Sequence, residues 1–481
     1  MTVMRLSSTF KAALAITAGA LALAACADVP KLGPKAVEKP ASAYATAQSF
    51  AAPAGDWSAD RWWDAYGDAQ LSKLVDEAIA NSPTLAQARA RLETADSQVM
   101  QSRAAELPTL SANGQVNETE ISRAQGFPPF IAQLLPKGYI PNGRTTLDAS
   151  YDLDLFGKNR AALASSVSER EAARADLAQA RLTLATAVAQ AYGDLARLGA
   201  ERDAAAEAVK NRTASSELTA ERVKNGLDTR AELYQSRSAT PTSRADVESL
   251  DEQILITRHR IAALLGEGPD RGLDITLPGP EQIKPFGLPA NLTANLLGRR
   301  PDIVAAKLRA QAAAKRIDVA KAAFMPNITL SGYIGQQAFP IGQMFTPYGA
   351  IGQIGPAVSL PLFEGGKLRA GYRGARADYD NAVDAYNQTV VAALQDVADA
   401  ATSVQSADRQ LDERREALKA GEAGYAIAQL RYKGGLSSYV AVLSAEDAVI
   451  AERRAFADAQ ARVFTLDIAL TRALGGGFTA S

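Results

Sequence analysis

The chain has 481 residues, a formal net charge of −1, and a single His and a single Cys. A charge this close to zero argues against nucleic acid as a partner. One His (His259) and one Cys (Cys26) cannot supply a His- or Cys-based metal site, a disulfide within the chain or a His-dependent catalytic triad. We therefore expect no metal, no nucleic-acid partner and no enzymatic activity.

The first element is an apolar run over residues 12–25, which follows Arg5 and Lys11. The run is too short to span a membrane permanently and is typical of a secretory signal peptide, which we assign to 1–25. It ends in Leu-Ala-Ala before Cys26, a sequence that resembles the lipobox of bacterial lipoproteins. Cys26 is therefore predicted to carry a covalent lipid, the alternative being an ordinary signal peptide that contains a cysteine. The Ala- and Pro-rich stretch 26–56 then reads as an extended, lipidated linker.

The rest of the chain repeats itself at an interval of about 210 to 220 residues, and such a duplication indicates two copies of one structural unit. The segment from Pro83 to Pro108 returns from Pro301 to Pro326, and both pairs of prolines lie 25 positions apart. The sequence Arg-Val-Lys-Asn-Gly-Leu at 222–227 returns as Arg-Tyr-Lys-Gly-Gly-Leu at 431–436. We assign the first repeat to 57–268, an inter-repeat linker to 269–290, the second repeat to 291–475 and a tail to 476–481.

In each repeat the apolar residues change from a helical spacing to a period of two after the second proline. The predicted strands cover about 109–118 and 144–156 in the first repeat, and about 327–336 and 350–362 in the second. Each is about ten residues long, with one apolar and one polar face, which is typical of strands that span an outer membrane. A small soluble sandwich is the alternative, but the strands come as two isolated hairpins bracketed by long helices.

Three acids, Asp148, Asp152 and Asp154, fall on the polar face of the second predicted strand. We expect them to line a lumen and to favour the passage of cations. Alternatively, they pair locally with Arg or Lys near the base of the barrel.

The longest predicted helices cover about 159–224 and 367–433 and contain no proline. A helix of roughly 66 residues is about 100 Å long, which favours coiled-coil-like packing over a globular core. Each helix ends at a glycine, Gly226 or Gly435, that suits a left-handed cap. An antiparallel helix then returns to about Leu265 or Leu474, and Pro241 is expected to kink the first of these.

Four strands cannot close a membrane barrel, and open sheet edges are not tolerated in lipid. The chain must therefore oligomerise, and three copies would give 12 strands, an even number within the range known for such barrels. The predicted fold class is a mainly helical membrane protein of mixed α and β structure. Its duplicated unit contributes four strands to a trimeric 12-stranded outer membrane β-barrel, above a long periplasmic α-helical barrel.

Several motifs resemble those of the TolC-like outer membrane efflux proteins, in the lipoprotein branch (NodT-type) that serves tripartite RND-type pumps. The most specific are Arg-Arg-Pro-Asp at 299–302 and the Phe-Gly at 156–157 after the second strand; the others are Tyr-Asp-Leu-Asp-Leu at 151–155, Ala-Leu-Leu-Gly at 263–266, Leu-Pro-Leu-Phe at 360–363 and Ala-Leu-Gly-Gly-Gly at 473–477. The resemblance covers essentially the whole mature chain. It implies a passive homotrimeric duct, lipid-anchored in the cell outer membrane and extending into the periplasm.

The resemblance also implies partners, namely a periplasmic membrane-fusion adaptor and an inner membrane RND-type pump, and export of drugs or other small toxic compounds. No cofactor is expected apart from the covalent lipid on Cys26. The exposed turns of the helical hairpins are the predicted adaptor-docking tips: Arg222, Gly226, Leu227, Arg431, Gly435 and Leu436.

The predicted periplasmic gate lies near Ile427 and Gln429. Relatives tend to carry an acid at the position of Gln429, and a ring of Gln attracts cations less strongly than a ring of Asp. Two alternative functions remain at this point: a duct for type I protein secretion and, in a different class, a periplasmic adaptor lipoprotein.

Overall fold

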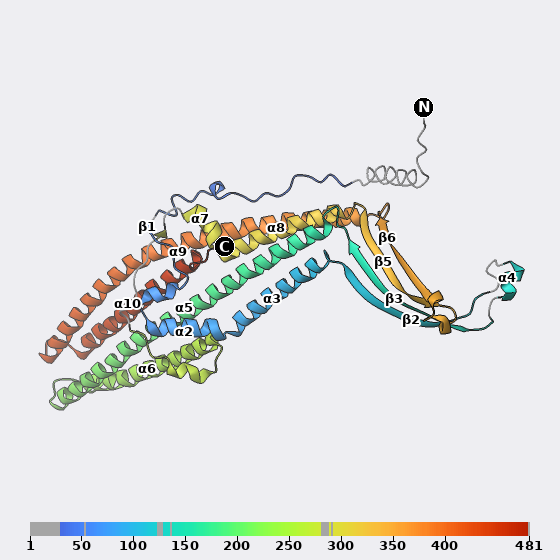
Figure 1. The fold of residues 1–481 in the computed structure, drawn as a ribbon. Coiled ribbons are helices and arrows are strands. Elements are labelled where there is room, and N and C mark those ends of the chain that lie inside the picture. Colours follow the sequence, from blue (N-terminus) through green and yellow to red (C-terminus); the bar gives the residue numbers. More distant parts are fainter. Residues whose placement is uncertain are drawn as a thin grey trace. The chain divides into compact units, whose positions relative to one another are not determined.

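The computed structural model describes residues 29–51, 54–122, 128–134, 137–279, 288–289 and 292–479. It divides into two compact units, each built from both repeats (Figure 1). Unit one comprises the chain up to Val37 together with Glu93–Glu171 and Lys307–Asp384; unit two comprises Glu38–Leu92, Ala172–Ala306 and Ala385–Ser481. Of the helices in the described part of the chain, none is sufficiently long and apolar to cross a membrane.

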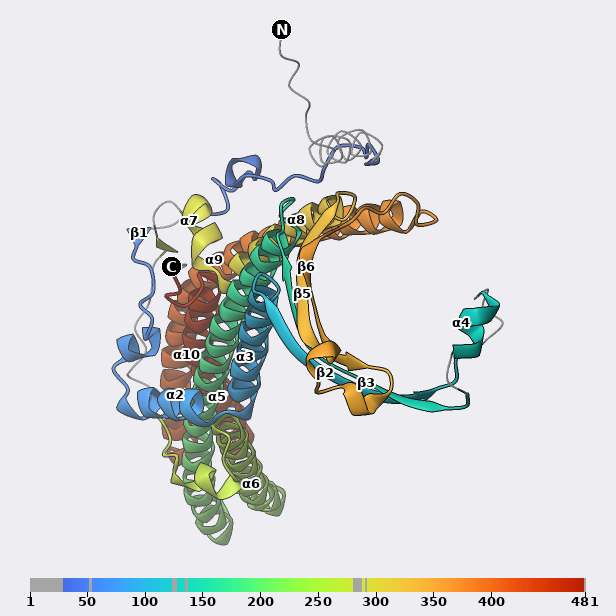
Figure 2. The same ribbon diagram turned by 45° about the vertical axis from the view of Figure 1, so that its right-hand side comes forward.

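Unit one contains a four-stranded antiparallel sheet in the order β2-β3-β5-β6, which curves along its strands (Figure 2). The strands are β2 (Thr109–Thr119), β3 (Ile140–Asp152), β5 (Asn327–Ala338) and β6 (Ala350–Ser359). The prediction of two hairpins is confirmed. The central pairing of β3 with β5 joins the two repeats side by side and leaves β2 and β6 as the edge strands.

The register confirms that the sheet has one polar and one apolar face. Asp148 lies between Ser111 of β2 and Tyr333 of β5, and the next row on that face places Thr146 opposite Asn113. On the other face, Leu147 lies between Ala112 and Ile334. Because side chains alternate along a strand, the polar face repeats at every second residue across all four strands. The apolar face carries exposed side chains such as Leu110, Val116, Leu330, Ile334, Ile354 and Val358.

The second strand of the first repeat is displaced from its predicted position. The prediction of 144–156 is wrong by four residues at each end, because β3 begins at Ile140 and ends at Asp152. At the start, pairing with β2 extends through Pro141, opposite Glu118. At the end, Asp154 has φ 41°, which breaks the extended backbone before α5.

Helices bracket each hairpin of the sheet. In the first repeat they are α2 (Ala69–Asn81), α3 (Pro83–Ala104), α5 (Lys158–Lys224) and α6 (Arg230–Leu265). In the second repeat they are α7 (Leu292–Arg299), α8 (Pro301–Ala322), α9 (Lys367–Lys433) and α10 (Tyr439–Ala473). Both long helices match their predicted extents almost to the residue, and α6 continues across Pro241.

The loop between β2 and β3 carries a short helix, α4 (Pro129–Leu134). Two short strands, β1 (Ala54–Gly55) and β4 (Leu288–Pro289), pair in parallel.

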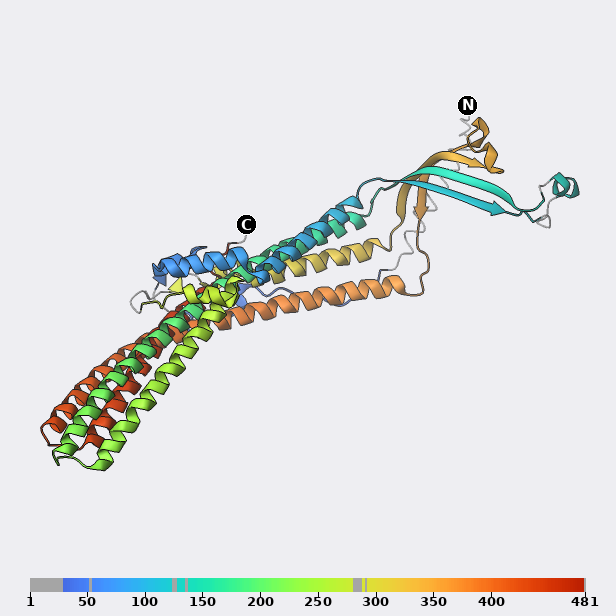
Figure 3. The same ribbon diagram turned by 90° about the horizontal axis from the view of Figure 1, so that it is seen from below.

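Within unit two, α6 and α10 pack beside the adjoining parts of α5 and α9 as a four-helix bundle (Figure 3). Trp62 and Trp63 lie in the core of this unit with Leu71, Leu195 and Phe464. Their rings meet edge to face with centroids 5.6 Å apart. Aromatic pairs in this geometry stabilise the start of the fold beyond the area they bury.

A buried acid lies in the same core. Tyr66 Oη donates a hydrogen bond of 2.5 Å to Asp467 Oδ2, and the side chain of Asp467 is almost completely buried. Burial, together with the negative charge of Asp408, raises the pKa of Asp467 to about 6, although the hydrogen bond from Tyr66 lowers it. A carboxyl that is easier to protonate than an exposed aspartate therefore joins the start of the first repeat to α10.

The Arg-Arg-Pro-Asp motif fastens the start of the second repeat to its surroundings in unit two. The Arg299 guanidinium lies 4.7 Å from the centroid of the Trp57 ring. Arg300 is buried and donates to Asp302 and Asp396 at 2.6–3.1 Å, and to the carbonyl of Ala473 at 3.3 Å. A guanidinium satisfies several fixed acceptors at once, which explains why arginine suits this position.

The N-terminal described segment is extended and is held to unit one by side chains. Val29 and Leu32 pack against a cluster of Ile317, Phe324 and Tyr372. The Ala36 amide donates to Asp380 Oδ1 at 2.9 Å, and Arg376 donates to the Gly33 carbonyl at 3.3 Å. These contacts begin three residues after Cys26, which itself lies outside the described residues together with the predicted signal peptide.

Candidate docking and gating site at the hairpin tips

The two predicted docking tips have the same backbone geometry. Gly226 and Gly435 both have φ 71°, a left-handed conformation that costs glycine little. The amide of the following leucine, Leu227 or Leu436, donates back to the carbonyl of Arg222 or Arg431 at 2.8 Å. This is the Schellman motif, which satisfies the last carbonyls of a helix and reverses the chain. Each glycine therefore acts as a helix cap, whatever else it does.

The tips are chemically different from one another. Arg222 forms a bidentate ion pair with Asp228 at 2.9 and 3.1 Å. At the position in the second tip that corresponds to Asp228 stands Ser437, whose buried hydroxyl has no hydrogen-bond partner in the described structure. Arg431 is exposed and makes no ion pair with any described residue. The side chains of Leu227 and Leu436 are 64% and 73% exposed.

The first tip also binds the second through a buried tyrosine. Tyr432 Oη donates to Asp228 Oδ2 at 2.5 Å and lies 2.9 Å from Thr219 Oγ1. The Arg222 guanidinium lies 4.6 Å from the centroid of the Tyr432 ring, within the range of a cation–π contact. We call the set Thr219, Arg222, Asp228 and Tyr432 the tip clasp. It joins the hairpin α5–α6 to the hairpin α9–α10.

The pKa values of the acid and the phenol in the tip clasp, Asp228 and Tyr432, are shifted in opposite directions. Burial alone would raise the pKa of Asp228, but hydrogen bonds from Arg222 and Tyr432 hold it below its ordinary value. Burial and the hydrogen bond to Asp228 raise the pKa of Tyr432 to about 12. Asp228 is therefore ionised and Tyr432 neutral at neutral pH, which is the state in which the donor and acceptor match.

The predicted gate residue Gln429 is engaged in a second polar chain between the hairpins. Gln429 Nε2 donates to Tyr425 Oη at 2.7 Å, and Tyr425 Oη donates to Glu446 Oε1 at 3.2 Å. Glu446 Oε2 in turn lies 3.5 Å from Arg212 Nε of α5. Both side chains of this ion pair are buried. Burial raises the pKa of Glu446, while the charge of Arg212 opposes the rise. Ile427, the other predicted gate residue, is 58% exposed and takes no part in this chain.

Among the predicted lumen acids, Asp148 and Asp152 lie on the polar face of β3. Asp148 Oδ2 accepts hydrogen bonds from Asn113 at 2.9 Å and from Thr146 at 2.7 Å. Asp152 Oδ1 accepts from the amide of Asp154 at 3.1 Å. The prediction that Asp154 shares this face is wrong, since Asp154 lies beyond the end of β3. Its carboxylate accepts the amides of Asn159 and Arg160 at 3.0 Å, which caps the first turn of α5.

Sequence reasoning missed Asp228, Thr219, Arg212 and Glu446. The difference between the repeats could have identified the first, because Asp228 and Ser437 occupy matching positions in otherwise similar tips. Burial of Arg212 and Glu446 in the four-helix bundle could not be inferred, since charged residues on long helices usually face water.

Comparisons with known proteins agree with this architecture. The family model for the outer membrane efflux protein matches residues 74–267 and 292–476. The chain is 35% identical to the fusaric acid resistance protein FusA of Burkholderia cepacia, over 76% of this chain and 69% of that protein. It is 30% identical to the multidrug resistance outer membrane protein MdtP of Escherichia coli K12, over 88% of each.

A solved structure shows the same fold. The outer membrane protein VceC of Vibrio cholerae superimposes with a TM-score of 0.80 at 38% identity, and the match covers 88% of this chain and all of that one. The duplicated helix–strand–helix unit, the two-faced sheet and the long helical hairpins are thus those of an efflux channel, and the chain belongs to the outer membrane efflux protein family.

Proposed function

We propose that three copies of this chain form a passive outer membrane duct that exports small toxic compounds delivered by a periplasmic adaptor and an inner membrane pump. The observation that carries the proposal is the sheet. It has four strands, one apolar and one polar face, and the edge strands β2 and β6. In lipid, the free edges require partners, and β2 of one copy against β6 of the next supplies them.

Native mass spectrometry of the detergent-extracted protein, after separation of outer from inner membranes, tests this proposal. We expect a trimer from the outer membrane fraction. A monomer there, or a protein found in the inner membrane, would leave the sheet edges open and contradict the duct.

We propose small molecules rather than secreted proteins as the cargo. The relatives FusA and MdtP are named for resistance to fusaric acid and to multiple drugs, which favours this class over type I secretion. The membership in the channel family speaks against the periplasmic adaptor alternative. Export by a strain lacking its own channel, complemented with this chain and scored by drug susceptibility, would separate the two kinds of cargo.

The tips are the proposed adaptor-docking surface. Their exposed residues Leu227, Leu436 and Arg431 combine apolar area with a cation that has no partner among the described residues. Interfaces are typically centred on such apolar groups with arginine beside them. We propose further that the tip clasp and the Gln429–Tyr425–Glu446 chain, which reaches α5 through the Glu446–Arg212 ion pair, hold the periplasmic end closed, because both join one hairpin to the other.

We propose a lipid on Cys26 as a membrane anchor. The extended segment that begins at Val29 is held against unit one, so a lipid three residues earlier would be tethered close to the end of α8 and the start of α9. Mass spectrometry of the N-terminal peptide tests this directly. An unmodified cysteine, or a mature chain that starts elsewhere, would contradict it.

A further inference from the structure

The loop between β5 and β6, residues 339–349, lies at the end of the sheet that is opposite to the start of α9 (Figure 1). It contains two short 3-10 turns, Ile341–Gln343 and Pro347–Gly349. The Gly349 amide donates to the Thr346 carbonyl at 3.0 Å within the loop. The loop therefore has a defined shape of its own.

The loop folds back onto the apolar face of the sheet. Gly143 of β3 belongs to this face, because side chains alternate along the strand and Leu147 lies four residues further on. A β-carbon built on Gly143 would lie 2.8 Å from Met344 Sδ and 3.1 Å from Ile341 Cδ1, so these loop side chains press directly against the strand backbone. Met344 is 4% exposed. The loop thus covers the side of β3 opposite to the one that carries Asp148.

The same loop covers a polar side chain on the apolar face. Gln336 of β5 shares this face with Ile334, two residues earlier. A β-carbon built on Gly349 would lie 2.9 Å from Gln336 Oε1, and this oxygen is buried without a hydrogen-bond partner in the described structure. An amide is costly to expose to hydrocarbon. A loop laid over Gln336 therefore suits a face that meets lipid.

Two aromatic side chains of the loop remain bare. Tyr348 is 94% exposed and Phe345 is 84% exposed. The loop sequence, Phe-Pro-Ile-Gly-Gln-Met-Phe-Thr-Pro-Tyr-Gly, contains no charged residue. Exposed apolar groups that gather in one place indicate a contact with another surface. The two rings therefore fit an apolar partner that the single chain does not supply.

The position of the loop decides between the candidate partners. The pore lies on the side of Asp148, which is the other face of the sheet. A neighbouring copy meets the chain at the edge strands β2 and β6, whereas the loop rests on the two central strands, β3 and β5. The partner that is continuous with the loop is the lipid that covers the apolar face. Aromatic residues at the level of the headgroups are usual where a barrel leaves the membrane.

We propose that residues 339–349 form an aromatic anchor, which places Phe345 and Tyr348 in the outer leaflet of the membrane. The inference rests on the proposed duct, since it needs the apolar face of the sheet to lie in lipid. It adds a partner for the loop, namely the boundary between acyl chains and headgroups. The uncharged loop fits this boundary rather than the phosphate groups, which are bound by Arg or Lys.

The test places a fluorescent reporter in the anchor of the full chain, as Tyr348→Trp, in phosphatidylcholine nanodiscs with lipids brominated close to the headgroup. Bromine quenches an indole that touches the lipid, and iodide in the buffer quenches an indole that meets water. We expect bromine to abolish most of the fluorescence that Tyr348→Trp adds, and iodide to leave it unchanged. Gln337→Trp is the matched control. Gln337 lies opposite Arg144 on the polar face, so its indole should respond to iodide and not to bromine.

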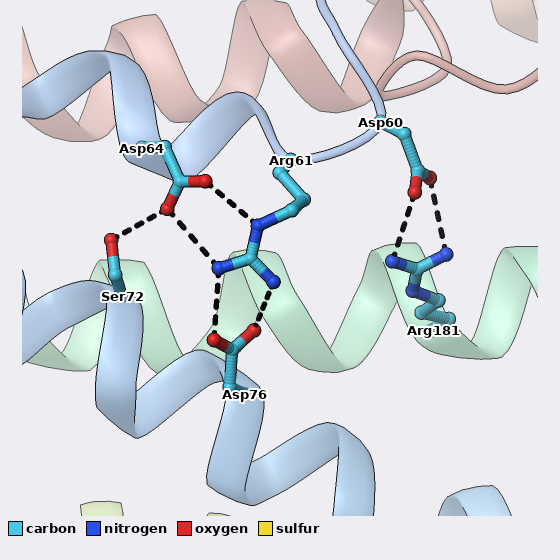
Figure 4. A network of polar contacts seen from close by, with 6 residues as sticks. All are labelled: Asp60, Arg61, Asp64, Ser72, Asp76 and Arg181. Carbon is cyan, nitrogen blue, oxygen red and sulfur yellow. Dashed lines mark hydrogen bonds and ion pairs between the residues drawn. The ribbon is translucent and has the colours of Figure 1, made fainter.

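The native tryptophans give a background that the wild type measures. Trp62 and Trp63 are 5% and 1% exposed. The Arg61 guanidinium lies 5.4 Å from the centroid of the Trp63 ring and is itself held by Asp64 and Asp76 (Figure 4). Neither quencher should reach these two indoles, so the difference from the wild type reports the added indole.

A pair of glycines tests whether the anchor depends on its seat on the apolar face. Gly143→Leu should lift Met344 from β3 and displace the loop, so that bromine quenches Tyr348→Trp much less. Gly342→Leu is the control, because a β-carbon there meets nothing within 4 Å. Equal quenching by bromine in the two backgrounds would overturn the placement of the loop.

Val358→Trp, on the apolar face of β6, separates this proposal from the duct. If bromine quenches Val358→Trp while iodide quenches Tyr348→Trp, the anchor is wrong and the duct stands. If Tyr348→Trp responds to neither quencher, another copy covers the loop and the anchor is again wrong. If bromine does not quench Val358→Trp, the sheet lies outside the bilayer and both proposals fail.

Discussion

Tyr432 and Asp228 lie 204 residues apart in the chain, yet their side chains form a 2.5 Å hydrogen bond between the two hairpin tips. The bond is partly buried, charge-assisted and supported by Arg222 and Thr219. Hydrogen bonds to a charged group are worth more than neutral ones, on the order of 1.5–3 kcal/mol. The tips of one chain are therefore fastened to each other.

Breaking the tip clasp should loosen the periplasmic end of the channel. In Asp228→Asn the charge that binds Arg222 and Tyr432 is lost, although the side chain keeps its size. We expect a several-fold rise in the open time of single channels in planar bilayers. Ser437→Ala, at the matching position of the other tip, should leave the recordings unchanged. Equal behaviour of the two variants would show that the clasp does not restrain the tips.

Blocking a tip should abolish export without disturbing assembly. In Gly435→Trp the new side chain enters open space at an exposed turn, with strain from the left-handed backbone of about 1–2 kcal/mol. We expect trimers in normal amount and no protection against exported drugs in a susceptibility assay. Gly268→Trp also projects into open space and serves as the control. Unchanged export by Gly435→Trp would contradict docking at the tips.

The buried acid Asp467 should make stability depend on pH. Its pKa is about 6 in the folded chain and 3.8 in the reference state. The folded state therefore holds more protons between these values, and the free energy of unfolding should fall as pH rises from about 4 to above 6.

In Asp467→Asn the free energy of unfolding should no longer fall as pH rises through this range, because the amide does not titrate. The amide oxygen can still accept the hydrogen bond from Tyr66. The melting temperature of the variant relative to the wild type should therefore rise between pH 5 and pH 7.5. A difference between the two proteins that stays constant over this range would show that Asp467 does not titrate there.

Asp148 should contribute to ion selectivity, because it lies on the polar face of the sheet. Asp148→Asn removes one negative charge per chain from the proposed lumen and should lower the ratio of cation to anion permeability measured from reversal potentials. Asp154→Asn is the control, since its carboxylate caps α5 and accepts backbone amides. If both substitutions change selectivity alike, local pairing at the barrel base explains the acids better.

The periodicity of the sequence predicted the elements well, because alternation and proline placement are local signals. β5 and both long helices lie within a few residues of their predicted ranges. The prediction that Asp154 lies on the polar face of the second strand failed because of the local backbone. The alternation of apolar residues continues through Leu155, whereas the backbone already turns at Asp154 to cap the next helix. The spacing of apolar residues depends on side-chain type and gives no information about such a turn of the backbone.

The candidate site was predicted only in outline. Glycine spacing identified both tips, since a left-handed cap is a property of one residue. The tip clasp and the Arg212–Glu446 pair depend on contacts between hairpins more than 200 residues apart, and no local pattern encodes them. Gln429 was predicted as a gate residue only because relatives tend to carry an acid at its position. That comparison gives no information about its hydrogen-bond partner, which is Tyr425 on the same helix.

Serine in the second tip, where the first has aspartate, gives the two tips of each chain different charges. A ring of three chains with identical repeats would present six equal tips and could receive six equal partners. With Asp228 in one repeat and Ser437 in the other, the ring keeps only threefold symmetry and presents two kinds of tip in alternation. In one tip Arg222 is neutralised by Asp228, and in the other Arg431 forms no ion pair with a described residue. The adaptor proposed above would therefore meet two tips that differ in charge, and could distinguish the two repeats by that difference.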